Sequence, residues 1–396
     1  MAQANLSIAV VGGGIGGLAA ALSLLRVGFD VHVYEQARAL GEVGAGIQMS
    51  PNAVRILARL GLSEESDRVG VRPLARQQRR WDDGRILLRA PLVGVVEEKF
   101  GAPYYQFHRA DLLGMLARAL PPERLHVAHR FTGLIDRGER LEAQFDNGVR
   151  VVADVLVGAD GIHSAVRSTL FGPEEPRFTG CIAYRGLVPA ERLRHLDLET
   201  TGQLWMGPGG HFVHYFVSSR RLVNFVGIAE RDAWQRESWT ERGAVADALA
   251  AFAGWHPQVR AIIAAVSETF VWGLFDRAPL PQWSRGRATL LGDACHPMLP
   301  FMAQGAAQAI EDGATLAACL TRANGADVPA ALRRYEALRL PRTARIQAMS
   351  RDNKTRFHLP DGPLQQARDR EMASDDADGP IRAIAWIYGH DAGAAA

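Results

Sequence analysis

Ser7-Ile8-Ala9-Val10-Val11-Gly12-Gly13-Gly14-Ile15-Gly16-Gly17 is the stretch that decides the fold. A short apolar strand leads into glycines spaced G-x-G-x-x-G, and an apolar helix pattern follows. Gly12 permits the tight turn, Gly14 lets the backbone approach a pyrophosphate, and Gly17 lets the helix pack closely on the strand. Glu35 ends the next predicted strand, at the spacing where an acidic side chain accepts hydrogen bonds from a ribose. The stretch therefore predicts a Rossmann-like unit whose helix N-terminus binds a dinucleotide.

The composition is that of an ordinary globular protein. The 396 residues are 47% hydrophobic and 22% charged with a formal net charge of +2, so we expect more than one domain and neither a nucleic-acid nor a membrane partner. Cys181, Cys295 and Cys319 form no C-x-x-C pair, which favours a reducing, cytoplasmic location. The first predicted strand begins too early to leave room for a signal peptide. We expect a monomer or a homodimer.

The order of predicted elements indicates a nucleotide-binding domain that a second domain interrupts. Strand and helix patterns typical of α/β folds alternate with segments whose polar and apolar side chains alternate, as they do in antiparallel strands. We expect an α/β fold in which a Rossmann-like domain carries an inserted antiparallel β-sheet domain for the substrate, followed by a C-terminal helical region. The predicted boundaries are 1–75, 101–178 and 285–355 for the nucleotide-binding domain, 76–100 and 179–284 for the insertion, and 356–396 for the C-terminal tail.

Two later strand ends carry polar motifs that extend the first signal. Asp160-Gly161-Ile162-His163-Ser164-Ala165-Val166-Arg167 follows one predicted strand, and Gly292-Asp293-Ala294-Cys295-His296-Pro297 follows another. Open α/β sheets bind their ligands at such carboxyl ends of strands. With the opening glycine turn, these motifs resemble the three signatures of single-component FAD-dependent aromatic hydroxylases, in the same order and over nearly the whole chain. Gly44-Ala45-Gly46-Ile47-Gln48 and Ala303-Gln304-Gly305-Ala306 are similar to the salicylate, 3-hydroxybenzoate and 6-hydroxynicotinate hydroxylases in particular.

The resemblance implies a Rossmann-like FAD-binding domain, with NADH or NADPH, O₂ and a small aromatic acid as reactants. NAD(P)H would reduce the flavin, and a flavin C4a-hydroperoxide would transfer a hydroxyl to an electron-rich ring. The implied FAD contacts are Gly12, Gly14 and Gly17 at the pyrophosphate, Glu35 at the adenosine ribose, Arg109 near the ribityl-phosphate arm, Asp293 at the ribityl chain, Gly305 and Ala306 near the flavin ring, Gln48 at the flavin loop or the substrate, and Asp160 at FAD and the nicotinamide donor.

His211 and Tyr215 are the catalytic candidates. They are four residues apart in a predicted strand, so both face the same side. A phenolate is a better target than a phenol, and a histidine is the natural base near neutrality. The pattern alone also fits two half-buried strand residues, but the similarity to 3-hydroxybenzoate and 6-hydroxynicotinate hydroxylases, which carry this pair, supports catalysis. Arg185 is a chemical candidate for a substrate carboxylate, although the interpretation as an ordinary salt-bridged strand residue is favoured. We expect no metal site.

The substrate stays open on sequence alone. Salicylate-type oxidative decarboxylation and 3-hydroxybenzoate-type hydroxylation fit equally, and a 6-hydroxynicotinate-type reaction comes third, because Gln48, Tyr215 and Pro300 each depart from one of these groups. An alternative on the same scaffold is a hydroxylase that tailors a larger aromatic natural product. A non-enzyme alternative is an FAD- or NAD-binding sensor module, which would bind the nucleotide without substrate-stimulated NADH oxidation.

Overall fold

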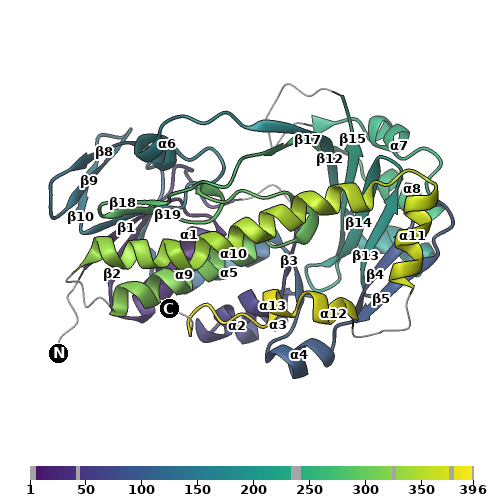
Figure 1. Ribbon diagram of the computed structural model, residues 1–396, viewed down its shortest axis with the longest axis horizontal. Helices are drawn as coiled ribbons and strands as arrows, with labels where there is room; N and C mark the ends of the chain where they lie inside the picture. Colours follow the sequence, from purple (N-terminus) through teal and green to yellow (C-terminus); the bar gives the residue numbers. More distant parts are fainter. Residues whose placement is uncertain (1–5, 42–44, 233–241, 323–326, 374–378, 395–396) are drawn as a thin grey trace.

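Three stretches that are far apart in the sequence meet in one sheet of the computed structural model (Figure 1). The structure describes residues 6–394 except 42–44, 233–241, 323–326 and 374–378. The strand order is β18-β19-β11-β1-β2-β7, and every neighbouring pair is parallel except the edge pair β18–β19. The strands are β1 (Ser7–Val11), β2 (Asp30–Tyr34), β7 (Leu125–His126), β11 (Val155–Gly158), β18 (Ser284–Arg285) and β19 (Ala288–Leu290). The Rossmann-like α/β class expected from the sequence is confirmed.

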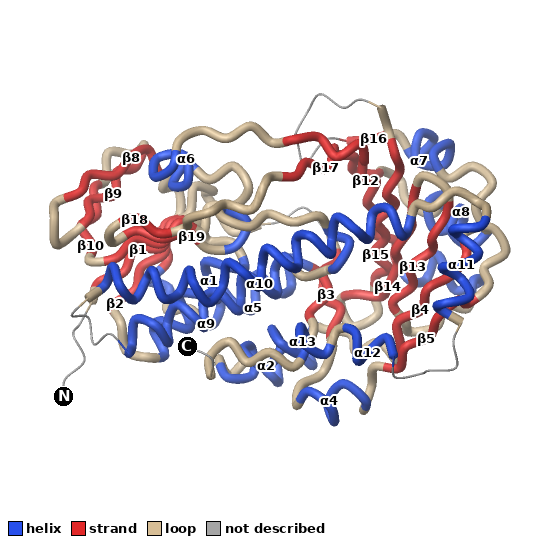
Figure 2. Tube along the Cα trace, in the orientation of Figure 1, coloured by secondary structure: helices blue, strands red, loops and turns tan. Residues whose placement is uncertain are grey.

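An eight-stranded sheet forms the other half of the molecule (Figure 2), in the order β16-β17-β12-β15-β14-β13-β4-β5. Its strands are β4 (Ala75–Arg80), β5 (Ile86–Pro91), β12 (Arg177–Pro189), β13 (Gly202–Gly207), β14 (Gly210–Val217), β15 (Leu222–Glu230), β16 (Arg242–Gly243) and β17 (Thr269–Asp276). The sheet was expected to be antiparallel, but β13 and β4 pair in parallel. The reason is that β4 and β5 come from an earlier excursion of the chain and add to the sheet at its edge. The domain boundaries themselves stay predictions.

Two smaller sheets complete the strands. One contains β8 (Phe131–Asp136), β9 (Leu141–Phe145) and β10 (Arg150–Ala153), and the other contains β3 (Gly46–Met49) and β6 (Tyr105–His108). The strand β3 lies between the two halves of the molecule in Figure 2, and it carries Gln48.

Helices cover the parallel sheet, pack beside the eight-stranded sheet and connect the two halves. They are α1 (Ile15–Arg26), α2 (Pro51–Arg59), α3 (Ser63–Val69), α4 (Val95–Phe100), α5 (Arg109–Ala119), α6 (Ala165–Phe171), α7 (Val245–Ala251), α8 (Pro257–Ala264), α9 (Gly305–Arg322), α10 (Val328–Phe357), α11 (Pro363–Met372), α12 (Gly379–Ala383) and α13 (Ala385–Tyr388). The 30 residues of α10 give it a length of about 45 Å, and Figure 1 shows it running from one half of the molecule to the other. None of the described helices combines the length and apolarity that a membrane crossing requires.

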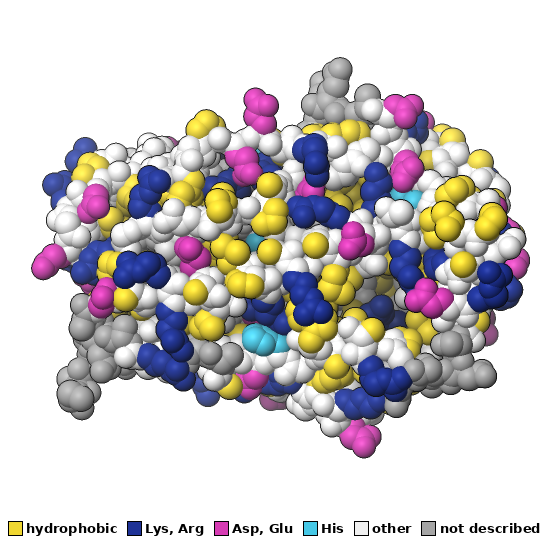
Figure 3. All heavy atoms as spheres, viewed as in Figure 1, with side chains coloured by type: hydrophobic (Ala, Val, Ile, Leu, Met, Phe, Trp, Pro, Cys, Tyr) yellow, Lys and Arg dark blue, Asp and Glu magenta, His cyan; other side chains and the backbone are white. Residues whose placement is uncertain are grey.

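The surface carries charges of both signs. On the face drawn in Figure 3, Lys and Arg side chains are interspersed with Asp and Glu side chains. This distribution matches the near balance of 45 basic and 43 acidic residues in the sequence.

A buried cluster of charged side chains joins α9 to α10. Arg339 is 1% exposed, and it pairs with Asp312, through Nε at 2.7 Å, and with Glu311. The Asp312 carboxylate also accepts hydrogen bonds from the Gly292 N–H at 3.0 Å and from His296 Nε2 at 2.6 Å. Burial alone would raise the pKa of Asp312, but His296 and Arg339 lower it to about 2. The cluster therefore fixes the loop after β19 to two helices.

We expect Arg339→Met to destabilise the protein by about 3–5 kcal/mol, because it leaves two buried carboxylates without their main cation. Urea unfolding measures this change. The control is Arg333→Met, an exposed position of the same helix, where we expect a change within about 0.5 kcal/mol. Equal stabilities of the two variants would show that the cluster does not hold the helices together.

Candidate functional site

The glycine turn after β1 packs against the motif that follows β11. Gly12 has φ +111°, and a Cβ at Gly12 would lie 2.3 Å from the carbonyl oxygen of Ala159. A Cβ at Gly17 would lie 2.0 Å from the Gly12 carbonyl oxygen, whereas a Cβ at Gly14 would meet nothing within 4 Å. Gly12 and Gly17 are therefore required by the packing of the protein itself. Gly14 borders open space at the N-terminus of α1, which fits the approach of a pyrophosphate.

Glu35 lies at the end of β2 and faces the same turn. Its Oε2 accepts a hydrogen bond from the Gly13 N–H at 2.6 Å, and its Oε1 accepts one from the Ala37 N–H at 2.8 Å. A carboxylate has about four acceptor positions, so both oxygens keep capacity for ribose hydroxyls. The side chain thus fixes the turn and fits the predicted ribose contact.

Asp160 and Arg167 connect the second motif to the third. Asp160 accepts hydrogen bonds from the Ser164 hydroxyl at 2.5 Å and from the Val166 N–H at 3.0 Å, at the start of α6. Arg167 Nη1 donates to the Ala294 carbonyl at 3.1 Å. These bonds give Asp160 a structural role at the motif. Its direct contact with FAD or a nicotinamide stays a prediction.

The third motif places Asp293 beside the first turn of α9. Asp293 belongs to the short 3-10 turn η3 (Gly292–Ala294), and its side chain is exposed. A Cβ at Gly305 would lie 3.9 Å from Asp293 Oδ1, and Ala306 is half-buried next to it. An exposed acid beside the N-terminus of an 18-residue helix fits the predicted contacts with the ribityl chain and the flavin ring.

Arg109 lies near Arg185, and its contact with FAD stays a prediction. It begins α5, its N–H donates to the Ala45 carbonyl at 2.8 Å, and its charge helps to lower the pKa of Arg185 to about 10, where burial is the main cause. Two neighbouring guanidinium groups suit an anionic cofactor. The open space at Gly14, the spare acceptors of Glu35 and the exposed Asp293 together show that these residues fit FAD.

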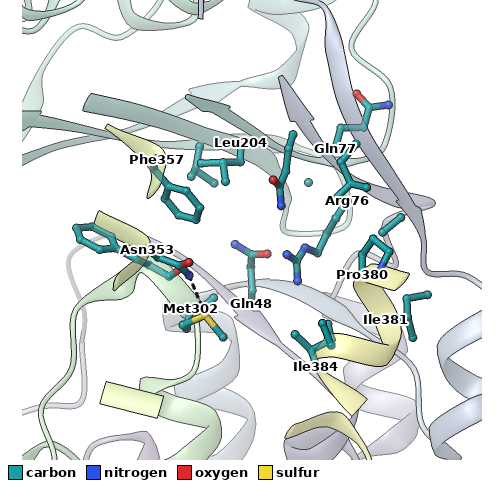
Figure 4. A pocket seen from close by; sticks show the side chains of 18 of the residues that line it. Gln48, Arg76, Gln77, Leu204, Met302, Asn353, Phe357, Pro380, Ile381 and Ile384 are labelled. Carbon is teal, nitrogen blue, oxygen red and sulfur yellow. Dashed lines mark hydrogen bonds between the residues drawn. The ribbon is translucent and has the colours of Figure 1, made fainter. Parts of the chain in front are cut away.

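A cavity of about 510 Å³ lies between the two halves of the molecule. Its volume falls within the range of roughly 300–1,000 Å³ that is usual for small-molecule sites. Apolar and aromatic side chains form much of its wall, including Leu204, Phe301, Phe357 and Ile384. Figure 4 shows Phe357 and Ile384 entering it from two sides, with the Gln48 and Arg76 side chains pointing toward each other in the middle.

Arg76 is a half-buried charged residue of the cavity wall, which Arg356 and Glu371 also line. Its Nη1 donates to the Tyr388 hydroxyl at 3.2 Å, and no carboxylate of the described residues forms an ion pair with it. Burial lowers the pKa of Arg76, but the Tyr388 and Tyr104 hydroxyls outweigh burial and hold it above its usual value. Gln78, two residues along the same strand, has a buried Oε1 that bonds to nothing in the part of the chain described. The cavity therefore offers a fixed positive charge and a spare polar group to a ligand.

His211 and Tyr215 lie on β14 and face the same side, as the sequence predicted. His211 lines the cavity and is 3% exposed. Tyr215 lies near Gln48, which accepts a hydrogen bond from the Tyr104 hydroxyl at 2.7 Å. Four residues of a strand span about 13 Å, so the two side chains cannot share one substrate hydroxyl. Tyr215 reaches the cavity through Gln48, and the catalytic roles of both residues stay predictions.

Several cavity residues were not found from the sequence. Arg185, the sequence-based candidate for a carboxylate, lies 4.2 Å from the ring of Trp272 and does not line the cavity. Arg76, by contrast, lines the cavity. The segment that contains Arg76 and Gln78 was predicted to be a strand. The sequence did not indicate which face of that strand would line a cavity. Tyr388 also lines the cavity and comes from the segment expected to be a tail. His358, which directly follows α10, lies behind His211 and was not found from the sequence either.

Comparisons with known proteins agree with this geometry. The profile of the FAD binding domain family matches residues 5–350. A 3-amino-4-hydroxybenzoate 2-monooxygenase of Streptomyces platensis is 45% identical over 385 residues, which cover 97% of this chain and 96% of that protein. A 6-hydroxynicotinate 3-monooxygenase of Pseudomonas fluorescens is 40% identical over 87% of this chain and 90% of its own. HpxO of Klebsiella pneumoniae, crystallised with FAD and uric acid, has a TM-score of 0.86 and 28% identity over 97% of this chain and 96% of that chain.

We expect Gly14→Val to fold normally and to lose FAD. The new side chain meets open space in the protein, and φ −73° at this position suits any residue, but it would occupy the place of the pyrophosphate. Flavin absorbance after purification and thermal unfolding of the apoprotein measure the two effects. Gly17→Ala is the contrasting variant, because its Cβ collides with backbone and should lower the thermal stability with or without FAD. A Gly14→Val protein with its full flavin content would refute the pyrophosphate placement.

Proposed function

The chain belongs to the single-component FAD-dependent aromatic hydroxylases, and we propose that its substrate is a single-ring aromatic acid whose hydroxyl lies across the ring from its carboxylate. The enzyme is a monooxygenase that uses FAD, NAD(P)H and O₂. When bound, FAD takes electrons from NAD(P)H and supplies activated oxygen to the ring. The protein contributes position, charge and the exclusion of water.

The observation that carries the proposal is the enclosed guanidinium of Arg76. A buried charge is costly unless a partner of opposite sign compensates it. Arg76 has tyrosine hydroxyls beside it and no ion-pair partner in the described residues. A substrate carboxylate supplies the missing negative charge and matches the two-pronged geometry of a guanidinium. We therefore assign Arg76 to the carboxylate end of the substrate.

The sheet places the base far from that charge. Arg76 is opposite Gly202 on β13, and His211 is opposite Met206 on the same strand. The Cα atoms of Arg76 and His211 are thus two strands and four residues apart, roughly 16 Å by strand geometry. Both side chains line one cavity. A small ring that contacts both must carry its carboxylate and its hydroxyl on opposite sides, the arrangement called 1,4.

His211 is the proposed base for that hydroxyl. Burial and the neighbouring His358 hold the pKa of His211 well below its usual value, so its imidazole is neutral and has a lone pair available at neutral pH. Gln48, held by Tyr104 and lying near Tyr215, is placed to position the ring. Loss of the phenolic proton increases the electron density of the ring at the moment when oxygen is transferred.

The names of the relatives are consistent with this arrangement. The substrates named for the Streptomyces platensis and Pseudomonas fluorescens enzymes, 3-amino-4-hydroxybenzoate and 6-hydroxynicotinate, both carry hydroxyl and carboxylate in the 1,4 relation. The sequence alone favoured salicylate and 3-hydroxybenzoate, whose groups are adjacent or one position apart. The position of Arg76 is the reason why we now place the 1,4 acids before salicylate and 3-hydroxybenzoate as candidate substrates.

We also propose a cytoplasmic location. Cys181, Cys295 and Cys319 are all free and buried, as in proteins of reducing compartments, and the reaction draws on NAD(P)H. The choice between monomer and homodimer stays a prediction.

A panel of acids tests the proposed substrate class. We expect 3-amino-4-hydroxybenzoate, 6-hydroxynicotinate and 4-hydroxybenzoate to stimulate NAD(P)H oxidation and O₂ uptake with formation of a hydroxylated product, more than salicylate or 3-hydroxybenzoate do. Product mass shows whether CO₂ is lost. Coupled turnover only with the 1,2 or 1,3 acids would refute the 1,4 assignment. NAD(P)H oxidation that none of these acids stimulates would favour a larger substrate.

Arg76→Met tests the carboxylate site directly. We expect the Kd of 4-hydroxybenzoate to rise about 10- to 150-fold, since a hydrogen bond to a charged group contributes about 1.5–3 kcal/mol. Phenol, which lacks the carboxylate, should bind both proteins alike. Titration of the flavin absorbance measures both ligands. The matched control is Arg85→Met, an exposed arginine of the same hairpin. A similar loss of affinity for phenol would show that Arg76 acts on the cavity as a whole.

A further inference from the structure

We propose that His358 and Glu230 continue from His211 as a proton relay that carries the substrate's hydroxyl proton from the cavity to the surface. This inference rests on the proposed function in one respect, because it requires that a hydroxyl of the substrate ring bind at His211. The two added residues come from different parts of the chain: Glu230 ends β15, and His358 follows the last residue of α10. Each is a positioning and proton-carrying residue outside the cavity wall.

The relay is a continuous line of hydrogen bonds. His211 Nδ1 lies 2.7 Å from His358 Nε2, and His358 Nδ1 lies 3.0 Å from Glu230 Oε1. His211 uses Nδ1 for this contact, so its Nε2 is the nitrogen left for the substrate. Both rings are nearly inaccessible, whereas the Glu230 side chain is 46% exposed. The line therefore begins in the cavity and ends in solvent.

The surroundings favour this route over a direct escape of the proton. Phe301 and Phe357 stand edge-on to the His211 ring, with centroid distances of 4.9 and 5.3 Å. They are apolar and cannot accept a proton. At the other end, Glu230 lines a surface pocket together with Gly209, Arg231 and Asp232, where water can take up the proton.

The proton balance needs no charged histidine. At the start, His211 donates its Nδ1–H to His358 Nε2, and His358 donates its Nδ1–H to the Glu230 carboxylate. The phenolic proton moves to His211 Nε2, the His211 Nδ1 proton moves to His358 Nε2, and the His358 Nδ1 proton moves to Glu230. A phenolate, two neutral imidazoles and a carboxylic acid result. Glu230 then releases its proton to water.

The charged neighbours are compatible with this sequence. Burial lowers the pKa of both His211 and His358. The hydrogen bond and charge of Glu230 partly offset this effect at His358, whose pKa still lies below its usual value. Lys354 Nζ lies 4.0 Å from Glu230 Oε1 and donates to the Thr179 carbonyl at 2.7 Å, so a cation stands beside the exposed end of the relay. Cys181 is the remaining titratable group beside His358, and burial raises the pKa of its thiol to about 11, so it stays neutral.

The same cluster has a second reading as a metal site. Ligand atoms of Cys181, Glu230 and His358 all lie within 4.8 Å of one another. A metal would require the Cys181 thiolate and would sit near the Lys354 ammonium group. Both conditions oppose a cation, so the relay is the better account of these residues.

The experiment follows proton release without turnover. Oxidised, FAD-loaded enzyme is mixed with 3-amino-4-hydroxybenzoate in weak buffer with a pH indicator, and stopped-flow absorbance records the indicator and the bound phenolate together. We expect Glu230→Gln and His358→Gln to slow both signals at least tenfold with the Kd of the acid changed less than threefold. His211→Gln should abolish the phenolate signal. Asp232→Asn, which removes another exposed carboxylate from the same surface pocket, should change neither signal.

Three results would overturn the relay. They are wild-type rates in Glu230→Gln, an equal slowing in Asp232→Asn, or a wild-type rate that changes after treatment with EDTA. If the acid does not bind at all, the proposed function fails at that point and ¹⁵N NMR decides the relay without a ligand. In histidine-labelled holoenzyme, both rings must be neutral with the proton on Nδ1. A His358 ring that carries its proton on Nε2 would contradict the direction of transfer.

Discussion

The charge pairing around Asp312 is the interaction on which the rest of the structure depends. This carboxylate is fully buried, and it simultaneously holds the Gly292 N–H, the His296 ring and the Arg339 guanidinium. Because an unpaired charge at this depth would be very unfavourable, the three partners are constrained to one arrangement. The turn that carries Asp293 is thereby fixed relative to α9 and α10. The cofactor side of the site is thus held by electrostatics in the core, not by the exposed loop itself.

The helix α10 extends this constraint to the substrate side. Arg339 lies about 28 Å along α10 from His358, which directly follows the helix. The same element therefore connects the buried cluster to the middle residue of the proposed relay. Between them it contributes Asn353 and Phe357 to the cavity wall. A rigid helix that touches both halves sets the distance between the flavin loop and the hydroxyl-binding end of the cavity. This explains why a long helix crosses the junction at which the two sheets meet.

The sequence predicted the cofactor half better than the substrate half, and the reason is physical. Gly12 and Gly17 are dictated by backbone contacts that only glycine allows, so their spacing is visible in one dimension. His211 and Tyr215 could be placed on one strand face from the period of a strand. Arg76 meets Tyr388 only because β4 and α13 converge in space, and His358 meets His211 only because the end of α10 reaches β14. No local pattern encodes either meeting. Arg185 shows the same limit, since its chemistry made it a candidate but the sequence could not tell that it lies outside the cavity wall.

The charges of the site also bear on how the hydroxyl proton of the proposed substrate leaves the cavity. The positive charge of Arg76, which lines the cavity, favours a negatively charged substrate. The same positive potential and the burial of His211 disfavour an imidazolium beside it. A proton that left the phenol and stayed on His211 would therefore offset much of the stabilisation that the site gives to the phenolate. Passing the proton to His358 and on to the exposed Glu230 keeps the phenolate and removes the competing charge, so the electrostatics that bind the acid also require the path by which its proton leaves.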